Sequence, residues 1–203
     1  TSQATTLTFN DIMGKVQQNE DKILDLMADV TVTSNDLFSY PEKQFKLWMK
    51  GNKSKVQVLL PIQKTSIIET TPNSINLNGQ PFLTVIEGQT DPGITRTDTI
   101  ESVSGDVYVL KTVITSNQGF AETTRYYIDY PKGVFIKTED EYKDQGKKGY
   151  SETTYSSVLI GDIWVMSGTV TKQEDFLDNR EYTTTETRSN IIINSGLSDS
   201  IFQ

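Results

Sequence analysis

The chain has 203 residues, with 19 Lys and Arg against 27 Asp and Glu, a net charge of -8, and neither histidine nor cysteine. One large all-β domain can reach this length, so we expect residues 1–203 to form a single domain. The negative charge would repel the phosphates that dominate nucleic-acid affinity, so nucleic acid is not an expected partner. Without histidine and cysteine, no Ser-His-Asp triad, Cys-His pair, disulfide, or thiolate or imidazole metal site can form.

The composition also bears on the kind of sheet and on the membrane. Hydrophobic residues make up 35% of the chain, below the roughly 45–50% apolar usage of typical globular proteins, which fits a sheet with one face in water. No apolar run approaches the ~18–20 residues of a membrane-spanning helix, so we expect a chain that does not span the membrane. The polar start Thr1-Ser-Gln-Ala-Thr-Thr resembles no signal peptide, and a leader or lipid anchor upstream of Thr1 stays open.

One helix is predicted near the N-terminus, from Thr8 to about Asn19. Apolar residues there recur at i, i+3, i+4 and i+7, the spacing that places side chains on one side of a helix. Thr8 is the expected N-cap, with Asp11 at the third helical position, where its charge suits the positive end of the helix dipole. The apolar stripe consists of Phe9, Ile12, Met13 and Val16.

The rest of the chain alternates apolar and polar residues with the period of a strand. After a first strand over 26–33, Gly51-Asn52 and Asn78-Gly79 supply the turns of two predicted hairpins. Beyond Asp106 the predicted strands have ~10 residues, compared with the usual five or six, so we expect a tall, strongly curved antiparallel sheet. These later strands are predicted at Val107–Thr115, Phe120–Tyr130, Val134–Tyr142, Tyr150–Ile160, Ile163–Lys172 and Arg180–Ile193.

A polar segment from Glu87 to Ser104 interrupts this pattern and includes Asp91-Pro-Gly93. It has few large apolar groups, so it is predicted to be a long surface excursion, either a lid or a disordered loop. No repeat of fixed period and no second domain boundary is visible in the sequence. We therefore expect the segment to interrupt one domain rather than to separate two.

An acidic cluster, Glu139-Asp140-Glu141 with Asp144, is the first candidate for chemistry. Such carboxylates can supply oxygen ligands for a hard cation or the acid pair of glycoside hydrolysis. The cluster lies at a predicted hairpin tip beside Lys143, Lys147 and Lys148, where solvated charge is the ordinary arrangement. The calcium-loop pattern and the glycine-rich phosphate loops are absent. We therefore predict no catalytic residue, no metal site and no cofactor, and keep a carboxylate-based hydrolase only as a third class of function.

The second candidate is a set of large apolar side chains on strands whose other faces carry Thr, Ser and Lys. Taken one by one, such residues are normally buried for packing. A helix of about a dozen residues cannot cover about ten long strands, however, so a curved apolar face would leave a cavity unless something fills it. The predicted cavity is lined by the helical stripe Phe9, Ile12, Met13 and Val16 and by Leu47, Met49, Phe82, Trp164 and Met166.

Trp48 and Lys50 are predicted on the strand face opposite Leu47 and Met49, together with Lys46. A tryptophan among lysines fits cross-strand packing, because such pairs stabilise sheets. It also fits a surface that binds a protein partner through the aromatic ring and the charges. Both interpretations stay open, and Trp48 and Lys50 are the predicted partner-binding residues.

The predicted helix is followed by Ala28-Asp-Val-Thr-Val-Thr33, Phe45-Lys-Leu-Trp-Met-Lys50, Leu77-Asn-Gly-Gln-Pro-Phe82 and the ending Ile193-Asn-Ser-Gly-Leu-Ser-Asp-Ser-Ile-Phe202. This order resembles the LolA-like periplasmic lipoprotein carriers. In that family an early helix precedes a strand, a Gly-x-Leu-Trp-x-Lys arm, an Asp-Gly-Lys hairpin, and a short final segment with Gly, Asp and Phe. The resemblance covers nearly the whole chain.

The resemblance implies a mainly β (α+β) fold: a strongly curved antiparallel sheet forming an unclosed barrel, with the N-terminal helix plugging the concave side. It implies a periplasmic or otherwise extracytoplasmic carrier that holds the acyl chain of a lipid or lipoprotein without catalysis. We expect a monomer that also meets an envelope protein, and the alternative is a sensor or interaction module with a filled core. Two features depart from the family: Gly51 stands where the carrier has an arginine, so arginine-dependent loading is not carried over, and the polar segment Glu87–Ser104 implies shortened or absent internal helices.

Overall fold

The computed structural model describes residues 7–36, 41–69, 93–144, 147–174 and 180–203. These residues form one helix, α1 (Phe9–Glu20), a short 3-10 helix, η1 (Asp199–Phe202), and eleven strands. The strands are β1 (Asp25–Ser34), β2 (Glu42–Lys50), β3 (Lys53–Leu60), β4 (Lys64–Glu69), β5 (Ile94–Ser104), β6 (Val107–Ser116), β7 (Ala121–Asp129), β8 (Val134–Asp144), β9 (Lys147–Ile160), β10 (Ile163–Glu174) and β11 (Glu181–Ile193).

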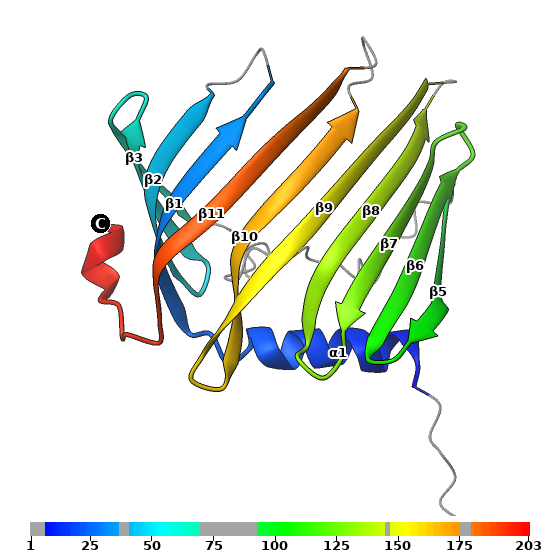
Figure 1. The fold of residues 1–203 in the computed structure, drawn as a ribbon, viewed down its shortest axis with the longest axis horizontal. Helices are drawn as coiled ribbons and strands as arrows, with labels where there is room; N and C mark the ends of the chain where they lie inside the picture. The colour runs from blue at the N-terminus through cyan, green and yellow to red at the C-terminus, as the bar shows by residue number, and fades with distance from the viewer. Residues whose placement is uncertain (1–6, 37–40, 70–92, 145–146, 175–179) are drawn as a thin grey trace, which may run out of the picture.

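All eleven strands belong to one antiparallel sheet of order β4-β3-β2-β1-β11-β10-β9-β8-β7-β6-β5. Strands that follow one another in the chain pair as neighbours, except β4 and β5, and β1 pairs with β11 as well as with β2. This pairing joins the two ends of the chain in the interior of the sheet, with Val30 opposite Arg188. The order ends at β4 and β5, which do not pair with each other, so the curved sheet in Figure 1 is an unclosed barrel. The predicted fold class is confirmed.

The prediction for Glu87–Ser104 was wrong in its second half. Residues Ile94–Ser104 form β5, which pairs with β6 from Ile94 to Ser104. Most side chains of β5 are exposed, because an edge strand meets water along one border and carries few residues that need burial. Its apolar alternation is therefore weak, and the segment looks like a loop in the sequence. The predicted hairpin at Ile75–Phe82 lies outside the described residues.

Helix α1 begins where the sequence predicted. The Thr8 hydroxyl accepts a hydrogen bond from the Asp11 backbone N–H at 3.2 Å, and the Asp11 carboxylate accepts one from the Thr8 N–H at 2.8 Å. This reciprocal capping box satisfies N–H groups that the first turn of a helix leaves unpaired. The hydrogen bonds from Thr8 also lower the pKa of Asp11, so the carboxylate is charged where the helix dipole favours negative charge.

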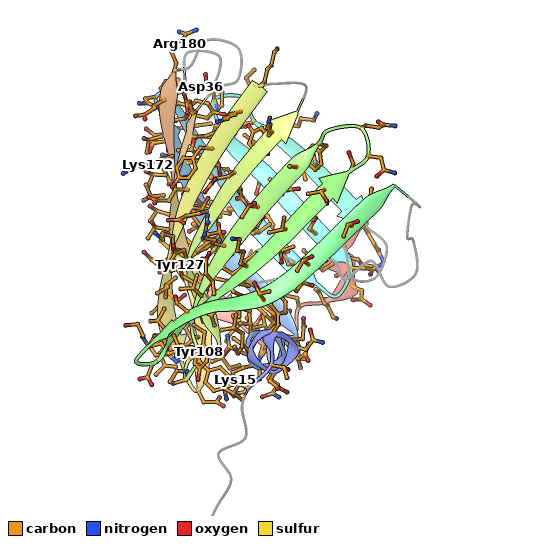
Figure 2. The ribbon with its side chains drawn as sticks, turned by 90° about the vertical axis from the view of Figure 1, so that its right-hand side faces the viewer. Lys15, Asp36, Tyr108, Tyr127, Lys172 and Arg180 are labelled. Atoms are coloured by element: carbon orange, nitrogen blue, oxygen red, sulfur yellow. The ribbon has the colours of Figure 1, made fainter. Side chains whose placement is uncertain are left out.

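The curved sheet has a concave face, which holds α1, and an outer face. Figure 2 shows α1 end-on at one end of the concavity. One group of buried residues packs the helix against the sheet, and a second lies around β1, β2 and β10. The first group, the helix cluster, is Ile12, Val16, Leu110, Tyr126, Ile128 and Phe135. The second, the β1 cluster, is Ile23, Leu26, Ala28, Val30, Leu47, Met49, Ile163 and Val165.

Two contacts fix the C-terminal half of α1 against the sheet. The Asn19 side chain donates to the Trp164 carbonyl at 2.7 Å and accepts from the Trp164 N–H at 3.1 Å, which pairs both backbone groups of that residue. In the β7–β8 turn, a Cβ on Gly133 would lie 2.6 Å from the Lys15 carbonyl oxygen, and the backbone there has φ of +64°. Only glycine allows this approach without strain. The helix is therefore anchored to the sheet by polar contacts as well as by its apolar stripe.

Candidate binding site on the concave face

The structure separates the predicted cavity residues into two groups instead of bringing them together. Ile12 and Val16 are buried in the helix cluster, and Phe9 and Met13 pack against it partly buried. Leu47 and Met49 belong to the β1 cluster. Met166 is buried, and Phe82 lies outside the described residues. The predicted lining thus consists of packed side chains at two places.

Trp164 joins the helix to the sheet mainly through its backbone, as described above. Its ring is partly buried and lies under a cation, because the Lys132 ammonium is 5.0 Å from the ring centroid. Such a cation–π contact stabilises both side chains. Trp164 therefore lies near the end of α1, where the helix covers the sheet.

Beyond the helix cluster, the concave face of β5–β9 is polar. Thr112 is paired in register with Thr124, which shares its face with Tyr126 of the helix cluster. Hydroxyl groups donate to the carboxylates here: Thr112 Oγ1 to Asp98 at 2.7 Å and Thr124 Oγ1 to Asp140 at 2.8 Å. We call this surface the polar concave patch; it consists of Asp98, Thr112, Glu122, Thr124, Thr138, Asp140 and Tyr155.

This patch disfavours negative charge at Asp140 and Glu122. Burial raises the pKa of Asp140, and burial followed by the charge of Asp140 raises the pKa of Glu122. Burial also raises the pKa of the neighbouring Tyr126 to about 12, because removal from water penalises the ionised form of each group. The sequence analysis missed this patch, since threonines occupy both faces of β7, and the alternation gives no sign of which one faces the helix.

The other side of the concavity is apolar. Val32, Phe45 and Val56 are partly buried and pack against the β1 cluster. Between the two sides, β11 carries Arg188, whose side chain is only 7% exposed and whose Nε donates to Glu186 at 2.8 Å. The concave face therefore changes from apolar at β1–β3, through the partly buried Arg188–Glu186 ion pair, to hydroxyl groups and carboxylates at β5–β9.

On the outer face, one of the two predicted partner-binding residues, Lys50, contacts the C-terminal segment of the same chain. Lys50 Nζ donates to the Leu197 carbonyl at 2.7 Å and to Asp199 at 2.9 Å. Lys55 Nζ donates to the Ile201 carbonyl at 2.8 Å and lies 6.0 Å from the centroid of the Trp48 ring. These contacts hold η1 against the arm formed by β2 and β3, and any partner that uses Trp48 and Lys50 would meet this segment there.

The acidic cluster is divided between the two faces of β8. Glu139 lies on the outer face, where Lys137 Nζ donates to it at 2.6 Å and the Tyr127 hydroxyl at 2.9 Å. Glu141 lies on the same face and accepts from Arg125 at 2.8 Å. Asp140 points to the concave face. Asp144 is the last residue of β8 and adjoins the turn, but the other three carboxylates lie within the strand and not at the hairpin tip as predicted. The alternation of β8 prevents the three carboxylates from sharing one cleft.

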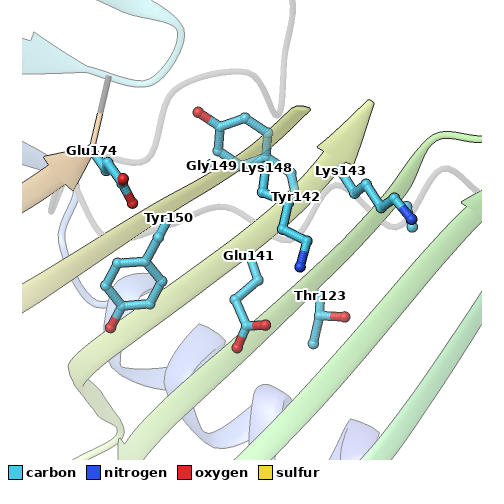
Figure 3. A pocket seen from close by; sticks show the side chains of 9 residues that line it. Thr123, Glu141, Tyr142, Lys143, Lys148, Gly149, Tyr150 and Glu174 are labelled. Carbon is cyan, nitrogen blue, oxygen red and sulfur yellow. The ribbon is translucent and has the colours of Figure 1, made fainter. Parts of the chain in front are cut away.

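A pocket of about 440 Å³ opens beside these strands (Figure 3). Its volume falls within the range of small-molecule sites. Four of its nine lining residues are charged: Glu141, Lys143, Lys148 and Glu174. None of the described residues predicted to line the apolar cavity lines this pocket, so it is a different site. Its lining is Ala121, Thr123, Glu141, Tyr142, Lys143, Lys148, Gly149, Tyr150 and Glu174.

The described residues include neither a cluster that could hold a metal ion nor a membrane-spanning helix. Among them, no group of three or more acidic side chains is arranged to hold a metal ion. Within the same part of the chain, no helix combines the length and the apolar character needed to cross a membrane.

Comparisons with solved structures concern the fold. A LolA superfamily protein from Nitrosomonas europaea aligns with a TM-score of 0.58 and 14% identity, over 98% of each chain. An outer membrane lipoprotein-sorting protein domain from Vibrio parahaemolyticus aligns with a TM-score of 0.55 and 13% identity, over 96% of this chain and 97% of the other. A DUF1329 family protein from Desulfovibrio piger gives a TM-score of 0.55 and 12% identity, over 96% and 95%. No family model and no curated protein sequence matches the chain. The chain thus has the LolA-like fold that the sequence resemblance implied.

Proposed function

We propose that this protein is an extracytoplasmic, non-catalytic carrier that binds the acyl chain of a lipid or lipoprotein in the concavity of its sheet. One observation carries the proposal: the concave face combines an apolar side, with Phe45 and Val32 partly exposed, and a hydroxyl-rich side that disfavours charge. An amphiphile has the same two parts. Burial of its chain would supply about 0.8 kcal/mol for each methylene group removed from water.

The fold supports this proposal and its location. One solved protein with this fold is described as an outer membrane lipoprotein-sorting domain, and such a role is exercised outside the cytoplasm. We propose the same compartment here, with a lipid or lipoprotein as ligand and an envelope protein as the partner that delivers or receives it. Function is decided by the site rather than by the fold, so the site residues must carry the test.

The proposed arrangement places the acyl chain along β1–β3 and the polar end of the ligand toward β5–β9. Phe45 would contact the chain because it is partly exposed beside the β1 cluster. The hydroxyl groups of Thr124 and Thr138 would serve the polar end, since hydroxyl groups can both donate and accept. Helix α1 would close the end of the concavity through the helix cluster, and the predicted residues Phe9 and Met13 would face the ligand from the helix.

Chain-length dependence is the direct test. Delipidated protein is titrated with a fluorescent fatty acid, which is displaced by saturated fatty acids of 12, 14 and 16 carbons, and native mass spectrometry counts the bound molecules. Complete burial of two more methylene groups would raise the affinity up to about 15-fold. One bound lipid with rising affinity supports the proposal. An absence of binding, or an affinity independent of chain length, contradicts it.

Two neighbouring residues on β2 give a matched pair of variants. Phe45→Gln changes the concave face, and Lys46→Gln changes the outer face, where Lys46 is exposed and 3.9 Å from Asp29. We expect Phe45→Gln to weaken fatty-acid binding about tenfold, because a buried polar amide replaces apolar contact. Lys46→Gln should leave the affinity unchanged. If both variants changed the fatty-acid affinity equally, the ligand would not lie against the concave face of β2.

A second candidate function is a binding module for an envelope protein, with its interior filled by its own side chains. The complete burial of Ile12, Leu110 and Ile128 favours it, because this end of the concavity leaves these three side chains no exposed surface. Such a module would use the outer arm with Trp48 and Lys50. Protein that binds no fatty acid, yet loses capture of an envelope protein after Trp48→Ala, would favour this candidate.

A further inference from the structure

The edge strand β5 has an almost palindromic sequence. The segment Ile94-Thr-Arg-Thr-Asp-Thr-Ile100 reads the same in both directions about Thr97, except that Arg96 is matched by Asp98. Two copies placed antiparallel with Thr97 opposite Thr97 would bring Arg96 of each copy opposite Asp98 of the other. The same register places Ile94 opposite Ile100. Each residue of the segment would therefore face an identical residue of the other copy or, at Arg96 and Asp98, a residue of opposite charge.

The same segment lies at an edge of the sheet. Within the described residues β5 pairs only with β6, and Figures 1 and 2 show it as the last strand on its side. One border of an edge strand offers N–H and C=O groups for pairing with another chain. The bulge of β5 falls between Ile100 and Ser102, so the segment from Ile94 to Ile100 keeps a regular strand geometry.

The side chains also lie on matching faces. Arg96 pairs in register with Ile114 and Asp98 with Thr112, which places both charges on the concave face. A two-fold axis perpendicular to the sheet keeps that face on the same side in both copies. Arg96 Nε lies 3.0 Å from Asp98 within one chain, and both side chains are about one-third exposed, at 28% and 32%. The Arg96 and Asp98 side chains are therefore accessible to Asp98 and Arg96 of a second copy.

We propose that two copies of this chain form an antiparallel dimer through β5, centred on Thr97, in place of the monomer expected from the sequence alone. A two-fold interface repeats each contact, so the dimer gains two Arg96–Asp98 contacts and two Ile94–Ile100 contacts. Opposite charges directly across paired strands stabilise the pairing, and like charges destabilise it. One strand per copy buries less area than a permanent dimer needs, so this dimer is weak and depends on concentration.

Charge reversal tests the pairing of Arg96 with Asp98 between copies. Variants that only disturbed the fold of each copy would not recover the dimer when mixed. In R96D, two aspartates of one copy face two of the other, and in D98R two arginines face two arginines, so we expect each variant to dimerise at least about tenfold more weakly. An equal mixture of the two variants restores both attractive pairs. Sedimentation velocity from micromolar to millimolar protein measures the dimer, and native mass spectrometry identifies the mixed species by its mass.

The expected result is dimer in the wild-type protein, monomer in each single variant, and heterodimer in the mixture. K172D is the control, because Lys172 is exposed on β10 in the interior of the sheet. Wild-type protein that stays monomeric throughout, or single variants that dimerise as strongly as wild type, would overturn the proposal. If Asp98→Arg prevents folding by removing the bond from Thr112, hydrogen exchange of wild-type β5 decides: its amides gain protection at high protein concentration only in this dimer.

Discussion

Carboxylates that are buried or partly buried have opposite surroundings on the two faces of the sheet. On the outer face, burial alone would raise the pKa of Asp25 and Glu139, but the donors beside them lower it below the ordinary value. On the concave face, burial raises the pKa of Asp140 and Glu122. The outer donors include backbone N–H groups and a lysine besides the Ser195 and Tyr127 hydroxyls, whereas among the described residues the donor to Asp140 is the Thr124 hydroxyl. The outer face therefore stabilises negative charge, and the concave face of β5–β9 resists it.

This difference matters for the proposed ligand. A concave face with hydroxyl groups and a low tolerance for charge suits a neutral polar group, such as the ester or amide that joins an acyl chain to its carrier molecule. The outer face, with its ion pairs, suits contact with water. Four changes, taken from the largest expected effect to the smallest, test how far the two faces differ.

The largest effect is expected from the helix cluster, where the concave face is apolar. Leu110 is completely buried between α1 and the sheet. Leu110→Ala should lower the free energy of unfolding by about 2–5 kcal/mol, because it removes buried methyl groups and leaves a cavity. Urea unfolding measures the change. Val113→Ala, on the outer face of the same strand and partly exposed, should cost under about 1 kcal/mol; equal costs would show that the two faces of β6 are buried alike.

The next effect concerns Asp25, which holds the C-terminal segment on the outer face. Its carboxylate accepts from the backbone N–H groups of Ser195, Gly196 and Leu197 at 2.9–3.1 Å. Asp25→Ala should lower the free energy of unfolding by about 2–3 kcal/mol, because these charge-assisted bonds are lost and the Leu197 N–H is left buried. Asp162→Ala, an exposed carboxylate paired with Lys22, is the control and should change little.

The pH dependence of the Asp25 variant follows from the lowered pKa. A carboxyl whose pKa is lower in the folded than in the unfolded protein stabilises the fold above the unfolded value, here 3.8. That stabilisation is lost as the pH falls through the folded pKa, because both states are then protonated. Wild type and Asp25→Ala should therefore approach each other in stability below pH 3.8. A constant difference would mean that Asp25 acts through packing rather than charge.

A smaller loss is expected at Glu139, on the outer face of β8. Glu139→Gln keeps the shape but removes the charge that Lys137 and Tyr127 stabilise. The pair is partly exposed, so the expected cost is about 0.5–1 kcal/mol at neutral pH. Raised salt should reduce this cost by screening. A stabilising effect of the substitution would show that the outer face does not favour charge.

The sequence predicted most of this fold because the apolar alternation is strong where one face is buried. The strands after Asp106 and the capped helix at Thr8 follow from spacing and residue type alone. β5 was missed because an exposed edge strand has little apolar alternation to detect. The hydrogen bonds to the Asp25 carboxylate were missed for another reason. Their donors lie about 170 residues away in the chain, and no local sequence pattern indicates such a contact.

The candidate site was predicted less well than the fold. Ile12 and Leu47 are buried in the two clusters, but periodicity does not separate a side chain that packs from one that lines a cavity. The polar concave patch could not be recognised from the sequence, because Thr123 and Thr124 are both threonines and lie on opposite faces of β7. Only the register of the strands relative to α1 shows which of them faces the concavity.

The smallest change tests the concave face at Asp140, next to Glu139 in the same strand but with the opposite expected sign. Asp140→Asn retains an oxygen that accepts from Thr124 and removes a charge that burial disfavours, so it should raise the free energy of unfolding at pH 7 by less than about 1 kcal/mol. A raised folded pKa makes the charged aspartate costly above that pKa, and the cost disappears as the pH falls to the unfolded value of 3.8. The gain from Asp140→Asn should therefore fade from neutral pH toward pH 3.8, as measured by urea unfolding at a series of pH values. A loss at pH 7 would mean that the concave face stabilises charge as the outer face does, and would remove the argument for a neutral polar group in the ligand.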